Sequence, residues 1–282
     1  MSGVIDIRGL SASTAAGAIL RNVSLSVKAG EVMALVGESG AGKSTIAKAI
    51  LGILPPAIRI TGGEILFEGT ELLSLPPPKF RELLGLRIAL IPQDPLTSLN
   101  PSRRVGDQLM DGLRLRAGLE KAKAVSRALS LLNDVHIREP ERVMARYPHE
   151  LSGGMRQRVL IAQAFSLNPQ VIIADEPTTA LDVTVQKQVL RLIRDMQREH
   201  RTTLLFVTHD LGVVAQICDR MTVLYGGAVL EQGGTAEILA HPRHAYTQAL
   251  LAASPRYDRP DQSLKPVPDS LLAELKREIA SR

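Results

Sequence analysis

Short apolar runs recur along the chain, each bounded by glycine, proline or charged residues. Runs of this length and composition predict the buried strands of a sheet. The clearest of them lies at residues 31–36, between Gly30 and Gly37. The others lie at residues 63–68, 87–91, 171–174, 203–207 and 221–225.

Between these runs the apolar spacing changes to that of helices. We expect helices at residues 43–54, 183–199 and 211–218, and a loop at Pro76, Pro77 and Pro78. Residues 105–145 carry helical periodicity and charge, and predict a helical subdomain. Strands that alternate with helices indicate an α/β fold with a largely parallel sheet. Residues 254–268 have the composition of a linker, and residues 269–282 predict a short helix.

The composition narrows the class of protein. The chain has 282 residues, of which 45% are apolar and 22% charged, as in ordinary globular proteins. Tryptophan is absent and aromatic residues make up 3%, which argues against a stacking platform for single-stranded nucleic acid. The net charge of +5 is mild and fits a solvated surface, so we expect no nucleic-acid partner.

A single cysteine, Cys218, excludes a disulfide within the chain and a cluster of thiolate metal ligands. We expect Cys218 to be a buried small hydrophobe. No signal peptide is evident, and no run approaches the roughly eighteen apolar residues that span a bilayer. These features predict a cytoplasmic chain whose membrane partners, if any, are separate.

The strongest motif follows the first apolar run and has the pattern G-x-x-x-x-G-K-S. Its residues are Gly37, Glu38, Ser39, Gly40, Ala41, Gly42, Lys43 and Ser44. Between a strand and a helix, such a loop wraps backbone N–H groups around phosphates. The lysine reaches the β- and γ-phosphates, and the serine hydroxyl ligates Mg²⁺. The motif therefore predicts MgATP binding and hydrolysis.

A second motif is the apolar run at 171–174, which ends in Asp175 and Glu176. Asp175 can hold Mg²⁺ through water, and Glu176 can orient or deprotonate an attacking water. The alternative is an acidic pair at a strand end with no catalytic role. A third motif, Ser152-Gly153-Gly154, precedes an apolar helix, where it is either a helix cap or a second anion site.

Taken together, these motifs resemble those of ABC-type ATPases over residues 1–253, with a helical subdomain at about 95–158. The family signature matches Leu151, Ser152, Gly153, Gly154, Met155 and Gln157. Gln93 matches the Q-loop, and Ala180, Leu181 and Asp182 match the D-loop. His209 matches the switch histidine.

The resemblance implies a P-loop NTPase core with an antiparallel β subdomain, and head-to-tail pairing of two ATPase domains. The signature of one domain would cover the nucleotide held by the phosphate loop and Thr45 of the other. Ser44, Gln93 and Asp175 would hold Mg²⁺, while Glu176, His209 and Gln93 would act in catalysis.

Two features depart from the common pattern of the family. Many members stack an aromatic residue on adenine upstream of the phosphate loop, but residues 10–20 contain no aromatic side chain. Adenine would then rest on aliphatic groups. His241-Pro242-Arg243-His244-Ala245-Tyr246-Thr247 is similar to a segment of the peptide and nickel importer branch, as is Asn100-Pro101. That branch often continues into cysteines that bind an iron–sulfur cluster, and here we expect no cluster.

These features predict the ATPase subunit of an importer for peptides, nickel or a metal chelate, with the short tail favouring the nickel and metal-chelate members. The expected partners are a second, non-identical ATPase, two permease subunits and an extracytoplasmic binding protein, at the cytoplasmic face of the membrane. The alternatives are an accessory ATPase of phosphonate (carbon–phosphorus lyase) metabolism and an ABC ATPase unrelated to transport.

Overall fold

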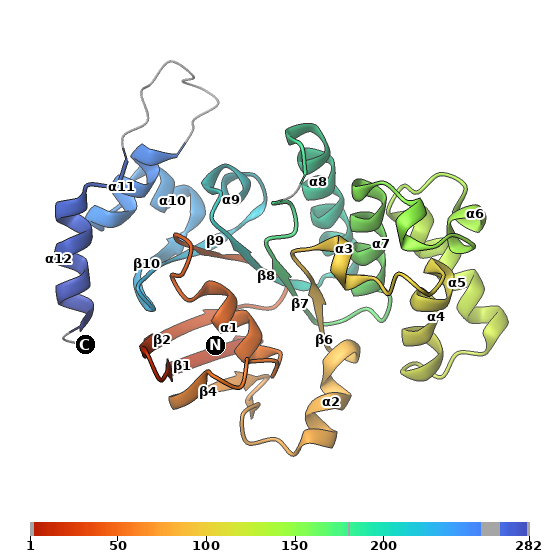
Figure 1. Ribbon diagram of the computed structural model, residues 1–282, viewed down its shortest axis with the longest axis horizontal. Coiled ribbons are helices and arrows are strands. Elements are labelled where there is room, and N and C mark those ends of the chain that lie inside the picture. Colours follow the sequence, from red (N-terminus) through yellow and green to blue (C-terminus); the bar gives the residue numbers. More distant parts are fainter. Residues whose placement is uncertain (1–2, 180, 255–265, 281–282) are drawn as a thin grey trace. The chain divides into compact units, whose positions relative to one another are not determined.

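The computed structural model describes residues 3–179, 181–254 and 266–280 (Figure 1). The chain forms two compact units. The first combines residues 1–75 with residues 205–282, and the second contains residues 76–204.

The first unit contains an antiparallel sheet with the order β2-β1-β4-β5. Its strands are β1 (Ile5–Thr14), β2 (Gly17–Val27), β4 (Arg59–Phe67) and β5 (Thr70–Glu71). Ile7 pairs with Leu25 on one side and with Ile65 on the other, and all three side chains are buried. Apolar residues that alternate with polar ones along β1 give the sheet one face for the core.

A second sheet in this unit leads to the phosphate loop. β3 (Val32–Val36) is buried at all five positions and runs parallel to β9 (Arg220–Tyr225), which pairs antiparallel with β10 (Ala228–Gly234). β8 (Thr203–Thr208), where the chain enters the unit, is the other neighbour of β3. The helices of the unit are α1 (Lys43–Ile50), α9 (Leu211–Ile217), α10 (Thr235–Ala240), α11 (Ala245–Ala253) and α12 (Asp269–Ala280). Cys218, at the end of α9, is buried as predicted.

The second unit contains a parallel pair of strands surrounded by helices. β6 (Ile88–Ile91) pairs with β7 (Val171–Asp175), and Ile91 lies opposite Ala174. The helices are α2 (Pro77–Leu86), α3 (Pro95–Ser98), α4 (Val105–Leu115), α5 (Lys121–Asp134), α6 (Pro140–Met144), α7 (Gly153–Phe165) and α8 (Val183–His200), with a 3₁₀ turn at Pro148–Glu150. Figure 1 shows α4 to α7 grouped together; α4, α5 and α6 lie within residues 105–145, where the sequence predicts a helical subdomain, and α7 follows them.

The expected loop at the three prolines was only partly right, because α2 begins at Pro77. Proline fits the first turn of a helix, where its missing N–H would have no partner within the helix. Pro77 and Pro78 therefore start α2, and Pro76 is its N-cap.

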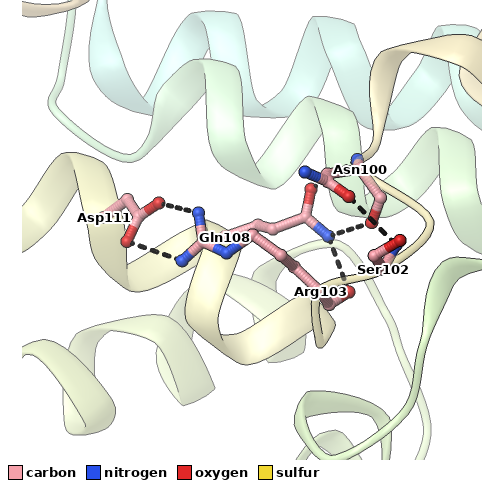
Figure 2. A network of polar contacts seen from close by, with 5 residues as sticks. All are labelled: Asn100, Ser102, Arg103, Gln108 and Asp111. Carbon is pink, nitrogen blue, oxygen red and sulfur yellow. Dashed lines mark hydrogen bonds and ion pairs between the residues drawn. The ribbon is translucent and has the colours of Figure 1, made fainter.

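A polar network holds the loop that leads into α4. Gln108 of α4 is 8% exposed, and its amide accepts from the backbone N–H of Asn100 at 2.8 Å. The same amide donates to the carbonyls of Asn100 (3.0 Å) and Arg103 (2.9 Å). Arg103 also forms an ion pair with Asp111, one helical turn beyond Gln108 (Figure 2). One buried side chain thus replaces regular backbone pairing across this loop.

Candidate functional site: the phosphate loop and the carboxylate strand

The phosphate loop lies in the first unit, between β3 and α1. Lys43 is the first residue of α1 and is buried, and its ammonium donates to the carbonyls of Gly37 (2.7 Å) and Glu38 (2.8 Å). These two bonds draw the loop into a ring around the start of the helix. Backbone N–H groups and the positive end of a helix are then available to an anion.

Glycine is required in this loop for steric reasons. Gly42 is the N-cap of α1 and has φ +99°, a left-handed conformation that other residues rarely adopt. A Cβ at Gly42 would also lie 2.6 Å from a methyl group of Leu20. Ser44 and Thr45, in the first turn of α1, are half-buried. The loop therefore has the shape of a phosphate cradle.

Two tyrosines lie next to the loop. Tyr246 of α11 is fully buried, and its ring centre lies 4.8 Å from that of Tyr225 at the end of β9. Burial and, second to it, the negative charge of Glu38 raise the pKa of Tyr246 well above its usual range, and both also raise the pKa of Tyr225. Tyr246 belongs to the segment 241–247, so this segment supports the phosphate loop from within the same unit.

His209 also belongs to the first unit. It follows the buried strand β8 directly, and its side chain is exposed. Asp210, the next residue, caps α9 by accepting from the backbone N–H groups of Gly212 and Val213. This cap fixes the backbone beside His209 and leaves its imidazole at the surface.

The second unit brings the predicted catalytic carboxylate and the glutamine together. Gln93 and Glu176 each follow the paired residues Ile91 and Ala174 at the same edge of the β6–β7 pair. The Gln93 amide donates to the Glu176 carboxylate at 3.3 Å. Asp175, the last residue of β7, is half-buried. Parallel pairing thus places an amide and two carboxylates at one edge.

Thr179 is a residue that sequence reasoning missed. Its hydroxyl donates to the Glu176 carboxylate at 2.9 Å. Glu176 has φ +45°, which is uncommon for a residue with a side chain. The sequence did offer a signal for this contact, because Thr178 and Thr179 follow Glu176 and Pro177 directly. Gln93 and Thr179 together orient the carboxylate.

The D-loop follows these residues. Ala180 lies outside the described residues, while Leu181 is half-buried. Asp182 is the N-cap of α8 and accepts from the backbone N–H groups of Thr184 and Val185. Asp182 therefore has a clear structural role in ending the loop.

The signature segment forms the start of α7. Ser152 is the N-cap, and its hydroxyl accepts from the N–H of Met155 at 3.3 Å. Leu151 and Gln157 are buried, whereas Ser152 and Gly153 are exposed and Gly154 is half-buried. The segment thus shows the predicted helix cap and presents its glycine turn at the surface.

The fold and the phosphate loop define a P-loop NTPase. Residues 20–179 match the ABC transporter family, and residues 230–278 match the family described as oligopeptide/dipeptide transporter, C-terminal region. The chain is 45% identical to the oligopeptide transport ATP-binding protein of Salmonella typhimurium over 249 residues, 88% of this chain and 74% of that one. It is 43% identical to the dipeptide transport ATP-binding protein of Bacillus subtilis over 272 residues, 95% of this chain and 81% of that one.

The fold is similar to that of a dimeric ATP-binding cassette in a post-hydrolysis state bound to ADP and Pi. The TM-score is 0.72 at 27% identity, with 82% of this chain and 98% of that chain covered. The chain therefore belongs to the ABC transporter ATP-binding family. It binds and hydrolyses ATP. Among the described residues, no helix has the length and apolar character needed to cross a bilayer.

Proposed function

We propose that this chain is the ATPase subunit of an importer that takes up dipeptides or oligopeptides through separate permease subunits. The match of residues 230–278 to the peptide-transporter C-terminal region supports this cargo, as do the names of the two relatives above. Nickel and metal chelates are the competing cargoes.

The hydrogen bonds that Glu176 accepts from Gln93 and Thr179 are the observation that carries the catalytic proposal. They leave the carboxylate oriented to position or deprotonate the attacking water. Lys43 and the N–H groups at the start of α1 bind the phosphates, and His209 contacts the γ-phosphate. The other members of the nucleotide set are Gly37, Glu38, Ser39, Gly40, Ala41, Gly42, Ser44 and Thr45.

We propose three side chains as ligands of Mg²⁺. Ser44, Gln93 and Asp175 offer hydroxyl, amide and carboxylate oxygens, the hard donors that this ion prefers. The ion would neutralise negative charge on the phosphates as the terminal bond breaks. The residues present fit this role by their chemistry.

The signature serves a second nucleotide, held by another ATPase chain. Ser152 and Gly153 are exposed at the start of α7, which supports a surface role. We propose head-to-tail pairing with a non-identical ATPase, in which the segment from Leu151 to Gln157 covers the partner's nucleotide and the D-loop from Ala180 to Asp182 lies at the same interface. Two permeases and an extracytoplasmic binding protein complete the assembly at the cytoplasmic face of the membrane.

Glu176→Gln tests the catalytic step. The amide cannot accept the proton of water, so we expect hydrolysis to fall about 10²- to 10⁴-fold while ATP binding persists. Glu199→Gln, an exposed change on α8, is the matched control and should leave turnover unchanged. Near-normal turnover of Glu176→Gln would remove Glu176 from its role.

Ser152→Trp tests the pairing. In a mixed dimer with one altered chain, we expect the site formed by the partner's phosphate loop to lose nucleotide, while the altered chain's own loop keeps it. Nucleotide occupancy of each site is measured by crosslinking a photoreactive ATP analogue. Loss at the altered chain's own loop alone would refute head-to-tail pairing.

The cargo is tested with the complex purified from membranes and reconstituted in vesicles with its binding protein. We expect a dipeptide or oligopeptide to stimulate ATP hydrolysis more than Ni²⁺ or a metal chelate does. Stimulation by Ni²⁺ or a chelate alone would overturn the peptide proposal. Purification with carbon–phosphorus lyase subunits in place of permeases would favour the phosphonate alternative.

A further inference from the structure

The C-terminal helix α12 and the phosphate loop border the same pocket of about 350 Å³. Its lining includes Ser39 of the loop and Leu272 and Lys276 of α12. Tyr225 and Gly226, where β9 ends, line it as well. The helix and the loop are therefore close neighbours within the first unit, and the turn after β9 lies next to both.

A short apolar seam holds α12 on the first unit. Leu275 and Ile279 lie one helical turn apart, and each is 3% exposed. The residues between them, Lys276, Arg277 and Glu278, are exposed. Because few buried side chains hold the helix, its docking responds to small changes in the surface beneath it.

Ile279 is the part of this seam that meets the turn between β9 and β10. A Cβ at Gly226 would lie 3.4 Å from the Cδ1 of Ile279, and apart from the chain neighbours of Gly226 no other described residue comes within 4 Å of that point. Gly226 and Gly227 have φ angles of +54° and +84°. Two glycines allow this turn but have no side chains to hold it. Ile279 therefore packs where a side chain of the turn would lie.

The same turn fixes a peptide group of the phosphate loop. Arg21 of β2 donates to the carbonyls of Gly226 (2.7 Å) and Gly227 (2.8 Å), so the two glycines are held together. The backbone N–H of Gly227 donates to the carbonyl of Ala41 at 3.2 Å. Because the C=O and N–H of a trans peptide group point in opposite directions, this bond directs the N–H of Gly42 away from the turn. The N–H groups of such loops are the donors that hold phosphate.

We propose that α12 positions the phosphate loop through this turn, with Ile279 as the positioning residue, so that docking of α12 and binding of a triphosphate strengthen each other. When α12 is docked, Ile279 holds Gly226, and Gly227 holds the peptide group between Ala41 and Gly42 in the direction that phosphate binding needs. When α12 is undocked, the ligand must order that peptide group itself and binds more weakly. The inference rests on the proposed function, since the phosphate loop must hold the triphosphate.

A ligand without a base distinguishes positioning from direct contact. The hydrogen bond from Gly227 acts on the part of the loop that holds phosphate. Side chains of α12 that line the pocket, such as Lys276, would instead act on the part of a nucleotide that lies beyond its phosphates. Inorganic tripolyphosphate has no base or sugar, so its affinity reports the positioning of the loop alone.

The experiment uses the full chain and isothermal titration in Mg²⁺ with two probes, tripolyphosphate and β,γ-imido-ATP. Ile279→Ser removes the apolar contact with Gly226, and Ile279→Val retains most of it. Arg277→Ser is the matched control, because it makes the same replacement at an exposed position of α12. The urea midpoint of each variant reports whether the chain is folded.

We expect Ile279→Ser to weaken both probes by the same factor, about five- to tenfold, the lower end of the usual coupling between two sites. Ile279→Val and Arg277→Ser should bind both probes as the wild type does. Wild-type affinity of Ile279→Ser for tripolyphosphate would overturn the proposal. A loss for β,γ-imido-ATP alone, or an equal loss in Arg277→Ser, would also overturn it.

Hydrogen exchange measures the reciprocal effect in the wild type. Because coupling between two sites is mutual, saturating tripolyphosphate should slow exchange of the α12 amides by the same factor. Burial of Ile279 that only stabilises the fold would not produce this dependence on ligand. Unchanged exchange in α12 would overturn the proposal, even if Ile279→Ser does not fold.

The same titrations separate this inference from the proposed function. If the wild type binds neither probe more tightly than Lys43→Ala does, the phosphate loop has no role in binding and the proposed function fails. If the wild type binds both probes but Ile279→Ser binds them equally well, only the inference about α12 fails.

Discussion

Replacing Gln108 by leucine should lower the free energy of unfolding of the second unit by about 3 kcal/mol. The buried amide makes three hydrogen bonds, one to the N–H of Asn100 and two to the carbonyls of Asn100 and Arg103. Each such bond contributes about 1 kcal/mol, and a group left buried without a partner costs about 1–3 kcal/mol. Asn100 and Arg103 are exposed residues, so water can reach part of the freed backbone. The lower end of that range, about 1 kcal/mol for each of the three lost hydrogen bonds, therefore applies and gives about 3 kcal/mol in total.

Urea unfolding followed by circular dichroism measures the loss, and hydrogen exchange at the Asn100 amide locates it. Asp107→Leu, at the exposed neighbouring position in the first turn of α4, is the control. It should cost at most about 1 kcal/mol, the value of a favourable charge at a helix start. If Gln108→Leu lies within about 0.5 kcal/mol of the wild type, the network does not stabilise the loop.

Three further outcomes follow from the structure. The pKa of Tyr246 is raised, chiefly by burial, so its contribution to stability is complete below the ordinary tyrosine pKa of about 10 and declines above it; unfolding measured from pH 8 to 11 should show this decline, and Tyr246→Phe should reduce it. Asp182→Ala removes the hydrogen-bond acceptor at the start of α8 and should lower the free energy of unfolding, measured in urea, by about 1 kcal/mol; an unchanged value would show that the cap does not stabilise the protein. Gly227→Ala places a Cβ against the Ile19 carbonyl at φ +84°, so it should lower both stability and ATPase rate; a wild-type rate would show that this turn does not support the phosphate loop.

Local patterns were sufficient for much of this protein. The phosphate loop follows from glycine and lysine at fixed spacing, and strands such as β3 and β7 follow from short apolar runs. Glu176 was recognised because it ends such a run. In these cases the information lies within a few neighbouring residues, where spacing alone determines which groups are close. The α/β class and the ABC family were also predicted correctly, from the order of such strands, helices and motifs along the chain.

Contacts between distant parts of the chain could not be derived in this way. Gln93 meets Glu176 across 83 residues because β6 and β7 pair in parallel and in register. The strand pattern predicts that both strands exist, but pairing and register depend on packing of the whole unit. The helix at 269–282 was expected, whereas its place beside the phosphate loop was not. A seam as short as Leu275 and Ile279 fits many apolar surfaces, so only the tertiary structure decided that α12 lies against Gly226.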